Sequence, residues 1–241
     1  MGVVLEAWGL GHRVDAYEDV TDQAPCFPFY FRMLRSGPHE NFHYVVGDPE
    51  TREAALVDPA FHVDRIVDTL ERDGYRLHQV WLTHGHWDHI GGVPDALRRG
   101  AERVFVHRAA QGHEKLESAP ASWLDDGERF RLGDLDVEAL HTPGHQPENT
   151  SFLVHGERPA LFTGDTLFIR SCGRTDFPGG DTDAMFASMQ RLRRLPGDVH
   201  VLPGHDYADA VSEPLATQCA ANPALTTTDR AAFEALPFLR G

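Results

Sequence analysis

Lysine is almost missing from this chain of 241 residues, because Lys115 is the only one and arginines supply the remaining positive charge. Against 22 lysines and arginines stand 37 aspartates and glutamates, which gives a formal net charge of −15. A surface of this sign repels phosphate backbones and anionic lipid headgroups, so we expect neither a nucleic acid nor a membrane as a partner. An anionic substrate would have to be held mostly by arginine, backbone amides or a metal.

Long apolar runs and a cationic N-terminus are also lacking. No apolar stretch reaches the roughly 20 residues that a membrane-spanning helix needs. Residues 1–6 carry none of the positive charge that opens a signal or transit peptide, so a cytoplasmic location is the default expectation. The three cysteines, Cys26, Cys172 and Cys219, are far apart and odd in number. They therefore favour neither a disulfide framework nor a Cys-x-x-Cys site.

The first half of the chain predicts a hairpin followed by helices and strands. Turn residues at 47–50 separate the two strands of a β-hairpin expected at 43–46 and 54–57. Apolar residues spaced i, i+3, i+4 and i+7 then predict an amphipathic helix over 63–70, which ends near Gly74. The other elements expected in this half are a strand at 79–82, a helix opening at 91–94, a strand at 104–107, and a surface loop or helix plus loop over 108–126.

The second half repeats this order of strands followed by helices. Asp181 is a candidate N-cap for a helix whose residues Met185, Phe186, Met189 and Leu192 point inward. The tail after residue 208 is expected to be helical, with breaks at the prolines of positions 214 and 223. The strands expected in this half lie at 129–132, 135–140, 150–154, 160–163 and 199–202.

Two such halves packed sheet to sheet, with helices outside, make an α/β fold of the four-layer αβ/βα sandwich type. No linker divides the chain, so we expect a single domain over residues 29–241. Residues 1–28 mix glycine, proline and acids, and we expect an N-terminal arm or edge strand there. This arm is also the candidate contact of a homodimer, although nothing in its sequence compels one.

A cluster of histidines and an acid follows the apolar residues 80–82. Within the segment Thr83-His84-Gly85-His86-Trp87-Asp88-His89, three imidazoles and one carboxylate fall within six residues. If this segment continues a strand, side chains 84, 86 and 88 share one face, and the next turn brings His89 beside Asp88. Imidazole nitrogens and carboxylate oxygens are ligands of Zn(II) and Fe(II). We therefore interpret the segment as a metal site rather than as a histidine-rich surface loop.

Three later strand ends supply what this segment lacks. His145 lies in the segment 141–145, Asp165 ends the segment 163–165, and His205 follows Pro203-Gly204. Taken singly, each has an ordinary alternative: a turn residue, a helix cap and a surface imidazole.

This ordered set of segments resembles the metallo-β-lactamase superfamily over residues from about 40 to 225. The resemblance implies the αβ/βα sandwich described above. It also implies two metal positions, the first held by His84, His86 and His145 and the second by Asp88, His89 and His205, with Asp165 bridging them.

Two chemistries of that superfamily fit the same ligands. The glyoxalase II branch hydrolyses S-acylglutathione thioesters with two Zn(II), which lower the pKa of a hydroxide between them. The persulfide dioxygenases use one Fe(II), held by His84, His145 and Asp165 as a facial triad with open positions. They oxidise glutathione persulfide with O₂ to sulfite and glutathione. The ligand set is common to both branches and does not discriminate.

The segment 163–177 resembles the persulfide dioxygenases, most closely in Ile169-Arg-Ser-Cys-Gly-Arg-Thr-Asp-Phe177. This resemblance implies that Arg174 pairs with a glutathione carboxylate, that Tyr207 bonds near the substrate sulfur, and that Cys172 lies beside the pocket. The ordinary alternatives are a turn held by Arg174 and Asp176, a buried Tyr207 hydroxyl, and Cys172 as a small core residue.

Other residues favour the hydrolases. Trp87 stands where the dioxygenases carry a small residue, and Gly91-Gly92 is typical of the hydrolase branch. Against that branch, the cationic side chains with which glyoxalase II holds glutathione have no counterpart in a chain almost without lysine. We therefore favour an iron-dependent persulfide dioxygenase over a glyoxalase II-like zinc hydrolase. A non-catalytic binding member of the superfamily is disfavoured by the intact ligand set.

Overall fold

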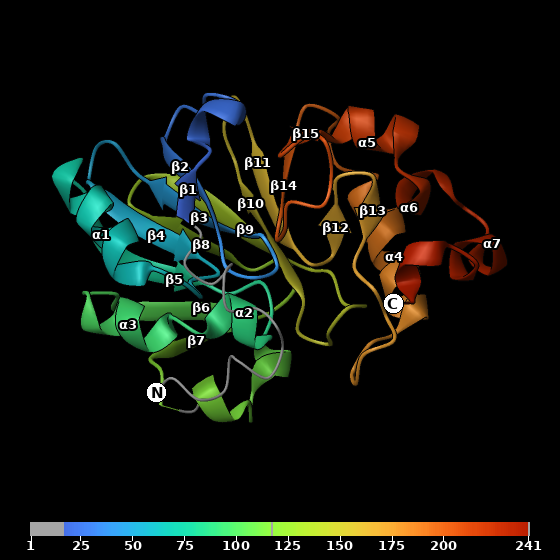
Figure 1. The fold of residues 1–241 in the computed structure, drawn as a ribbon, viewed down its shortest axis with the longest axis horizontal. Helices are drawn as coiled ribbons and strands as arrows, with labels where there is room; N and C mark the ends of the chain where they lie inside the picture. Colours follow the sequence, from blue (N-terminus) through green and yellow to red (C-terminus); the bar gives the residue numbers. More distant parts are fainter. Residues whose placement is uncertain (1–16, 117, 241) are drawn as a thin grey trace.

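Two β-sheets pack face to face in the middle of the structure, with helices on their outer sides (Figure 1). The computed structural model describes residues 17–116 and 118–240. The first sheet has the strand order β1-β2-β3-β4-β5-β6-β7. Its strands are β1 (Tyr17–Asp19), β2 (Tyr30–Ser36), β3 (Asn41–Gly47), β4 (Glu53–Val57), β5 (Arg76–Trp81), β6 (Arg103–His107) and β7 (Ala121–Leu124).

The second sheet has the order β15-β14-β11-β10-β9-β8, and a two-stranded sheet pairs β12 with β13. Their strands are β8 (Arg129–Leu132), β9 (Leu135–His141), β10 (Thr150–Val154), β11 (Ala160–Gly164), β12 (Leu167–Phe168), β13 (Ser171–Cys172), β14 (His200–Pro203) and β15 (Glu213–Pro214). Strand β11 pairs parallel with β14 and antiparallel with β10, which is in turn antiparallel to β9. Strands β9, β11 and β14 therefore end at the same edge of the sheet.

The helices divide between the two outer faces. The α-helices are α1 (Val63–Arg72), α2 (Trp87–Ile90), α3 (Val93–Arg98), α4 (Thr182–Leu192), α5 (Leu215–Ala221), α6 (Pro223–Thr226) and α7 (Arg230–Glu234). Short 3-10 helices are η2 (Thr21–Gln23), η3 (Arg108–Ala110), η4 (Glu114–Leu116) and η5 (Pro237–Leu239). None of the helices in the described part of the chain has the length and apolarity to cross a membrane.

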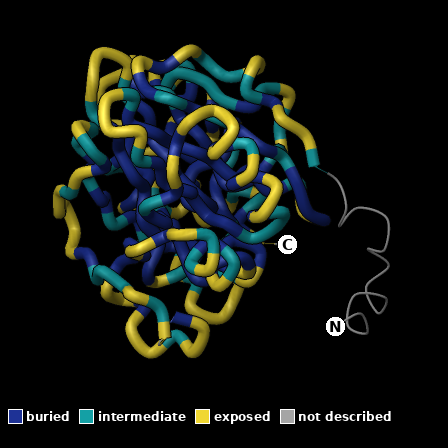
Figure 2. Tube along the Cα trace, turned by 90° about the vertical axis from the view of Figure 1, so that its left-hand side faces the viewer, coloured by how far each residue is buried: buried dark blue, intermediate teal, exposed yellow. Residues whose placement is uncertain are grey.

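Three separate apolar clusters hold these four layers together. The central cluster lies between the sheets and joins residues such as Tyr44 of β3 with Phe152 of β10. A second cluster joins the outer face of the first sheet to α1 and α3, and a third joins the second sheet to α4 and the C-terminal helices. The buried strands run through the interior, and the exposed residues lie mainly in the outer loops (Figure 2). The predicted four-layer αβ/βα sandwich is thus confirmed.

Several predicted elements are also confirmed at the level of local structure. Strands β3 and β4 pair antiparallel as the expected hairpin, and α1 buries Val63, Ile66, Val67 and Leu70. Asp181 caps α4, because its side chain accepts a hydrogen bond of 3.0 Å from the amide of Ala184. The tail is helical with breaks at the expected prolines, since α5 follows Pro214 and α6 begins at Pro223.

Two expectations are wrong. Strand β5 ends at Trp81, so residues 84, 86 and 88 do not share a strand face; Trp87–Ile90 instead form one turn of helix α2. The segment 108–126 is more than surface loop and helix, because Ala121–Leu124 add a parallel strand to β6. Most of the arm expected over residues 1–28 lies outside the described residues, and of its described part Tyr17–Asp19 form β1 at the sheet edge.

Candidate metal centre

The donor side chains come together where strand ends from both sheets meet. Strands β4 and β5 of the first sheet run parallel and are followed by Asp58 and the segment 83–90. Strands β9, β11 and β14 of the second sheet are followed by His145, Asp165 and His205. Because parallel strands end at one edge, residues up to about half the chain apart become neighbours.

The segment 83–90 forms a helical turn where a continuous strand was expected. The amides of His89 and Ile90 donate to the carbonyl of His86 at 3.0 and 3.1 Å, which closes a single helical turn directly after the extended residue His86. This turn places Asp88 and His89 in the interior, where they are 9% and 1% exposed. A chain reversal therefore brings the four donors together.

The first group of donors contains His84, His86 and His145. Nδ1 of His86 lies 3.1 Å from Nε2 of His84 and 3.0 Å from Nε2 of His145. The opposite nitrogen of His145 donates to the carbonyl of Arg174 at 2.8 Å, which leaves its Nε2 with a lone pair. Nδ1 of His84 faces Thr83 Oγ1 at 3.1 Å. Since that hydroxyl donates to Asp58, it can accept from His84, whose Nε2 then also carries a lone pair.

The second group contains Asp88, His89 and His205. Nε2 of His89 lies 3.2 Å from Nε2 of His205, and Oδ2 of Asp88 lies 3.9 and 3.7 Å from these two nitrogens. Nδ1 of His205 donates to the carbonyl of His39 at 2.8 Å, so its Nε2 again presents a lone pair to the centre.

Asp165 stands between the two groups. Its Oδ1 lies 3.4 Å from Nε2 of His89, and its Oδ2 lies 3.6 Å from Nε2 of His145 and 3.3 Å from Nε2 of His205. Oδ1 is buried and has no hydrogen-bond partner among the described residues. A cation would satisfy both this buried oxygen, which has no hydrogen-bond donor, and the imidazole lone pairs that converge on it. The donor set therefore fits a divalent metal bound by imidazole and carboxylate.

The electrostatics of the centre agree with this fit. Burial lowers the pKa of His86 to about 4 and also lowers that of His84, so both rings are neutral near pH 7, as ligands must be. Burial opposes charge on His89, but Asp165 and Asp58 raise its pKa to about 10. The carboxylates of Asp165 and Asp58 thus favour positive charge at the second group of donors, which a bound metal would supply.

Asp58 is a residue of the site that the sequence analysis did not identify. Its carboxylate accepts from the Thr83 amide at 2.7 Å and the Thr83 hydroxyl at 2.6 Å, and it lies 2.9 Å from Nδ1 of His89. Asp58 can therefore orient His89. Its carboxylate also lies with His84 and His89 in a group of possible metal donors. The signal available in the sequence was an acid directly after an apolar strand, although Asp-Pro also suits a plain turn.

Glu148 is a second such residue. It is 7% exposed, and its Oε1 accepts a hydrogen bond of 2.9 Å from the amide of Gly85, between the first two histidines. Nothing in its local sequence distinguishes it from a loop acid.

The three predicted substrate residues line a cavity of about 550 Å³ over the metal centre. Arg174 holds Asp176 through two bonds of 2.6 and 2.8 Å and lies 4.3 Å from the centre of the Phe177 ring. Tyr207 is stacked on His205, with ring centres 4.8 Å apart and planes 4° apart. Cys172 is 2% exposed, and burial raises the pKa of its thiol well above the ordinary value. The structure thus shows the turn held by Arg174 and Asp176 and the buried position of Cys172. The roles of Arg174, Cys172 and Tyr207 toward a substrate stay predictions.

The family profile described as the metallo-beta-lactamase superfamily matches residues 37–205, which is well over half of the chain and includes all seven donors. The chain belongs to the metallo-β-lactamase superfamily. Enzymes of this superfamily bind metal, and the cluster described above is suited to that task.

Relatives from two branches of the superfamily are similar to this chain. Hydroxyacylglutathione hydrolase of Polaromonas sp. is 34% identical over 180 residues, which cover 74% of this chain and 66% of the relative, just under two thirds of its length. The mitochondrial persulfide dioxygenase ETHE1 of Homo sapiens is 33% identical over 204 residues, 83% of this chain and 77% of the relative. The crystal structure of ETHE1 from Myxococcus xanthus superimposes with a TM-score of 0.76 at 32% identity, covering 86% of this chain and 92% of the other. These nearly equal identities support the branch that contains both enzymes rather than one of the two reactions.

Proposed function

We propose that this superfamily member is an iron-dependent dioxygenase that oxidises the terminal sulfur of a low-molecular-weight persulfide. Glutathione persulfide is the substrate that the sequence resemblance implies. In the overall reaction, RSSH, O₂ and H₂O give RSH, sulfite and two protons; the sulfur–sulfur bond breaks, and four electrons pass from sulfur to O₂.

The observation that carries this proposal is the contact between Arg174 and His145. The carbonyl of Arg174 accepts the Nδ1 proton of His145 at 2.8 Å and so fixes which nitrogen faces the first metal position. Arg174 belongs to the segment 169–177, the part of the chain that most resembles the persulfide dioxygenases. The same segment therefore orients a metal donor and forms a wall of the cavity.

The residues of the proposed iron position are His84, His145 and Asp165. Fe(II) bound there would supply the redox chemistry by which O₂ reacts with sulfur. His84 and His145 contribute imidazoles held by Thr83 and Arg174, and Asp165 contributes a carboxylate. In this proposal the Tyr207 hydroxyl, beside His205, donates to the substrate sulfur.

The second candidate is a glyoxalase II-like hydrolase of S-acylglutathione thioesters with two Zn(II). The observation in its favour is the complete second donor group of Asp88, His89 and His205, which a mononuclear enzyme does not need.

The two functions are separated by assaying one protein in two metal-loaded forms. Protein reconstituted anaerobically with Fe(II), and protein loaded with Zn(II), are each given glutathione persulfide in an oxygen-electrode assay and S-lactoylglutathione in a thioester assay. The proposal expects O₂ uptake with sulfite formation by the iron form alone. Thioester cleavage by the zinc form without O₂ uptake by the iron form would establish the hydrolase instead.

A further inference from the structure

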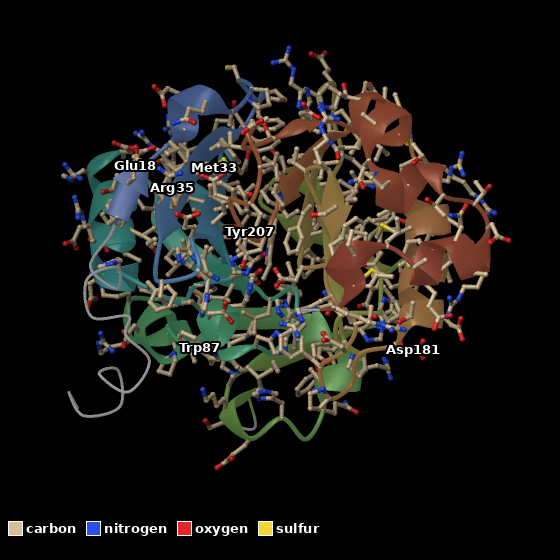
Figure 3. All side chains as sticks on the ribbon, turned by 45° about the vertical axis from the view of Figure 1, so that its right-hand side comes forward. Glu18, Met33, Arg35, Trp87, Asp181 and Tyr207 are labelled. Atoms are coloured by element: carbon tan, nitrogen blue, oxygen red, sulfur yellow. The ribbon has the colours of Figure 1, made fainter. Side chains whose placement is uncertain are left out.

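The large apolar side chains that remain exposed in this protein gather at the mouth of the metal cavity. Within residues 17–116 and 118–240 they are Trp87, Phe177 and Tyr207, which are 46%, 37% and 57% exposed. All three line the cavity of about 550 Å³. They come from helix α2, the segment before α4 and the loop after β14, and Figure 3 labels Trp87 and, above it in that view, Tyr207. Exposed apolar patches of this kind mark ligand sites.

Each of these rings packs against neighbouring aromatic or imidazole rings and remains partly exposed. Trp87 makes edge-to-face contacts with His39 and Phe61, at 5.8 and 5.9 Å between ring centres. Phe177 stands on the metal donors His86 and His145 at 5.5 and 5.4 Å.

Tyr207 lies flat on His205 and meets Phe168 edge-on at 5.3 Å. Because each of Trp87, Phe177 and Tyr207 is held by packed neighbouring rings, the three form a preformed aromatic rim at the mouth of the cavity.

Apart from the metal donors, the charge on the cavity wall comes from Arg174, which is paired with Asp176. Arg174 is the one lysine or arginine among the described residues that line it. Both oxygens of Asp176 bond its guanidinium, which also lies over the Phe177 ring. The remaining charged lining groups, Asp88 and Asp165, belong to the metal centre. Glutathione carries two carboxylates and an ammonium group, and this wall offers no second cation for them.

We propose that the aromatic rim selects persulfides whose organic group is uncharged and apolar, such as an arylalkyl group, over glutathione persulfide. An aromatic group entering the mouth would stack against Trp87 and Tyr207, while its terminal sulfur reaches the metal position. This inference rests on the proposed function, which supplies the reaction at the terminal sulfur. The aromatic rim contacts only the organic part of the substrate.

The first test compares benzyl persulfide with glutathione persulfide by initial O₂ uptake of the iron-loaded protein. The expected result is a kcat/KM higher by about tenfold or more for benzyl persulfide, because each ring contact contributes to its binding. Trp87→Ala and Phe177→Ala should raise KM for benzyl persulfide by a larger factor than KM for glutathione persulfide. Tyr207→Phe should keep the benzyl preference and Tyr207→Leu should reduce it. Equal kcat/KM values, or equal losses on both substrates, would overturn the inference.

A second test needs no turnover. Benzyl methyl sulfide and S-methylglutathione, which have no reactive sulfur–hydrogen bond, are titrated into the protein while tryptophan fluorescence is followed. Benzyl methyl sulfide should change the emission at lower concentration than S-methylglutathione, and Trp87→Phe should remove that change. Tighter binding of S-methylglutathione would contradict the inference.

The failure of the inference can be told apart from failure of the proposed function. If glutathione persulfide supports O₂ uptake better than benzyl persulfide, the dioxygenase stands and the rim inference falls. If neither persulfide supports O₂ uptake, the dioxygenase falls. The rim inference is then decided by the fluorescence titration and by a second comparison. In that comparison the zinc form hydrolyses S-benzoyl thiophenol and S-lactoylglutathione. The rim inference requires the aromatic thioester to be the preferred substrate.

Discussion

The backbone amide of Gly85 donates a hydrogen bond of 2.9 Å to Oε1 of Glu148 and thereby ties the His84–His86 loop to the loop that follows His145. A neighbouring bond of 2.8 Å from the Thr150 amide to the Thr83 carbonyl joins the same two loops. These bonds link the two sheets at the first metal position. Glu148 is therefore a positioning residue, because it acts on the donors through the backbone.

We expect Glu148→Ala to weaken metal binding by about tenfold or more, as removal of an outer partner of metal ligands commonly does. Glu148→Gln keeps an oxygen that accepts from the Gly85 amide, so it should retain most of the affinity. Competition with a chromophoric chelator measures the dissociation constant for both variants. Equal losses in the two variants would show that the carboxylate charge matters, rather than the hydrogen bond.

Asp58→Ala removes the acceptor for Thr83 and His89 at once. We expect the second metal position to lose affinity most strongly, since His89 loses the bond that fixes its ring. The free energy of unfolding should fall by about 1–3 kcal/mol, because buried donors lose their partner. Metal content per chain after dialysis, together with urea denaturation, reports both effects. Full metal content in a stable variant would contradict the positioning role.

His205→Ala separates one-metal from two-metal chemistry. His84→Ala, His145→Ala and Asp165→Ala should abolish the metal-dependent activity under either function. Under the iron proposal His205→Ala should be far milder, because His205 is not part of the mononuclear set. The activity of each variant is compared with that of His155→Ala, a matched control at a half-buried histidine that pairs with Glu138 instead. Near-equal loss in the four site variants would argue for a metal pair.

Asp48 provides a stability prediction away from the metal centre. Burial opposes its charge, but bonds from the Thr51 hydroxyl at 2.7 Å and the Asp134 amide at 3.1 Å lower the pKa of its carboxyl. A lowered pKa in the folded state means that its contribution is present above the unfolded value of about 3.9 and is lost as the pH falls through the folded pKa.

Asp48→Asn should therefore lower the free energy of unfolding by about 1–3 kcal/mol near pH 7. The difference from the parent protein should shrink below about pH 4. Urea denaturation over a pH series checks both statements, and a difference that grows toward acid would contradict the assignment.

Much of the centre could be predicted because its donors sit at strand ends, where apolar runs give way to histidine and aspartate. The shape of the segment 83–90 could not, because the helical turn of α2 depends on bonds to His86 within a packed core. Asp58 and Glu148 were missed for a related reason. Each acts through a contact between segments far apart in sequence, and the local sequence of a buried acceptor resembles that of an ordinary turn.

Strand β2 is an element of the fold that the local sequence does not reveal, for the same reason. Its residues Phe31 and Met33 point into the central core while Arg32 faces outward, yet the charges within Tyr30–Ser36 obscure this alternation. Arg32 is held by Asp73, and Arg35 by Glu18 and Asp206, partners that local sequence does not reveal. Strand β7 likewise exists because β6 offers a parallel edge.

The most direct test of the account measures O₂ consumption as a function of iron content in anaerobically reconstituted protein. Samples with graded iron content and no zinc are given a persulfide, and O₂ uptake and sulfite are measured together. An iron-dependent persulfide dioxygenase should show uptake that rises linearly with iron, reaches its maximum at one iron per chain, and yields one sulfite for each O₂ consumed. Uptake that is absent at full iron content, or that requires a second metal per chain, would contradict it.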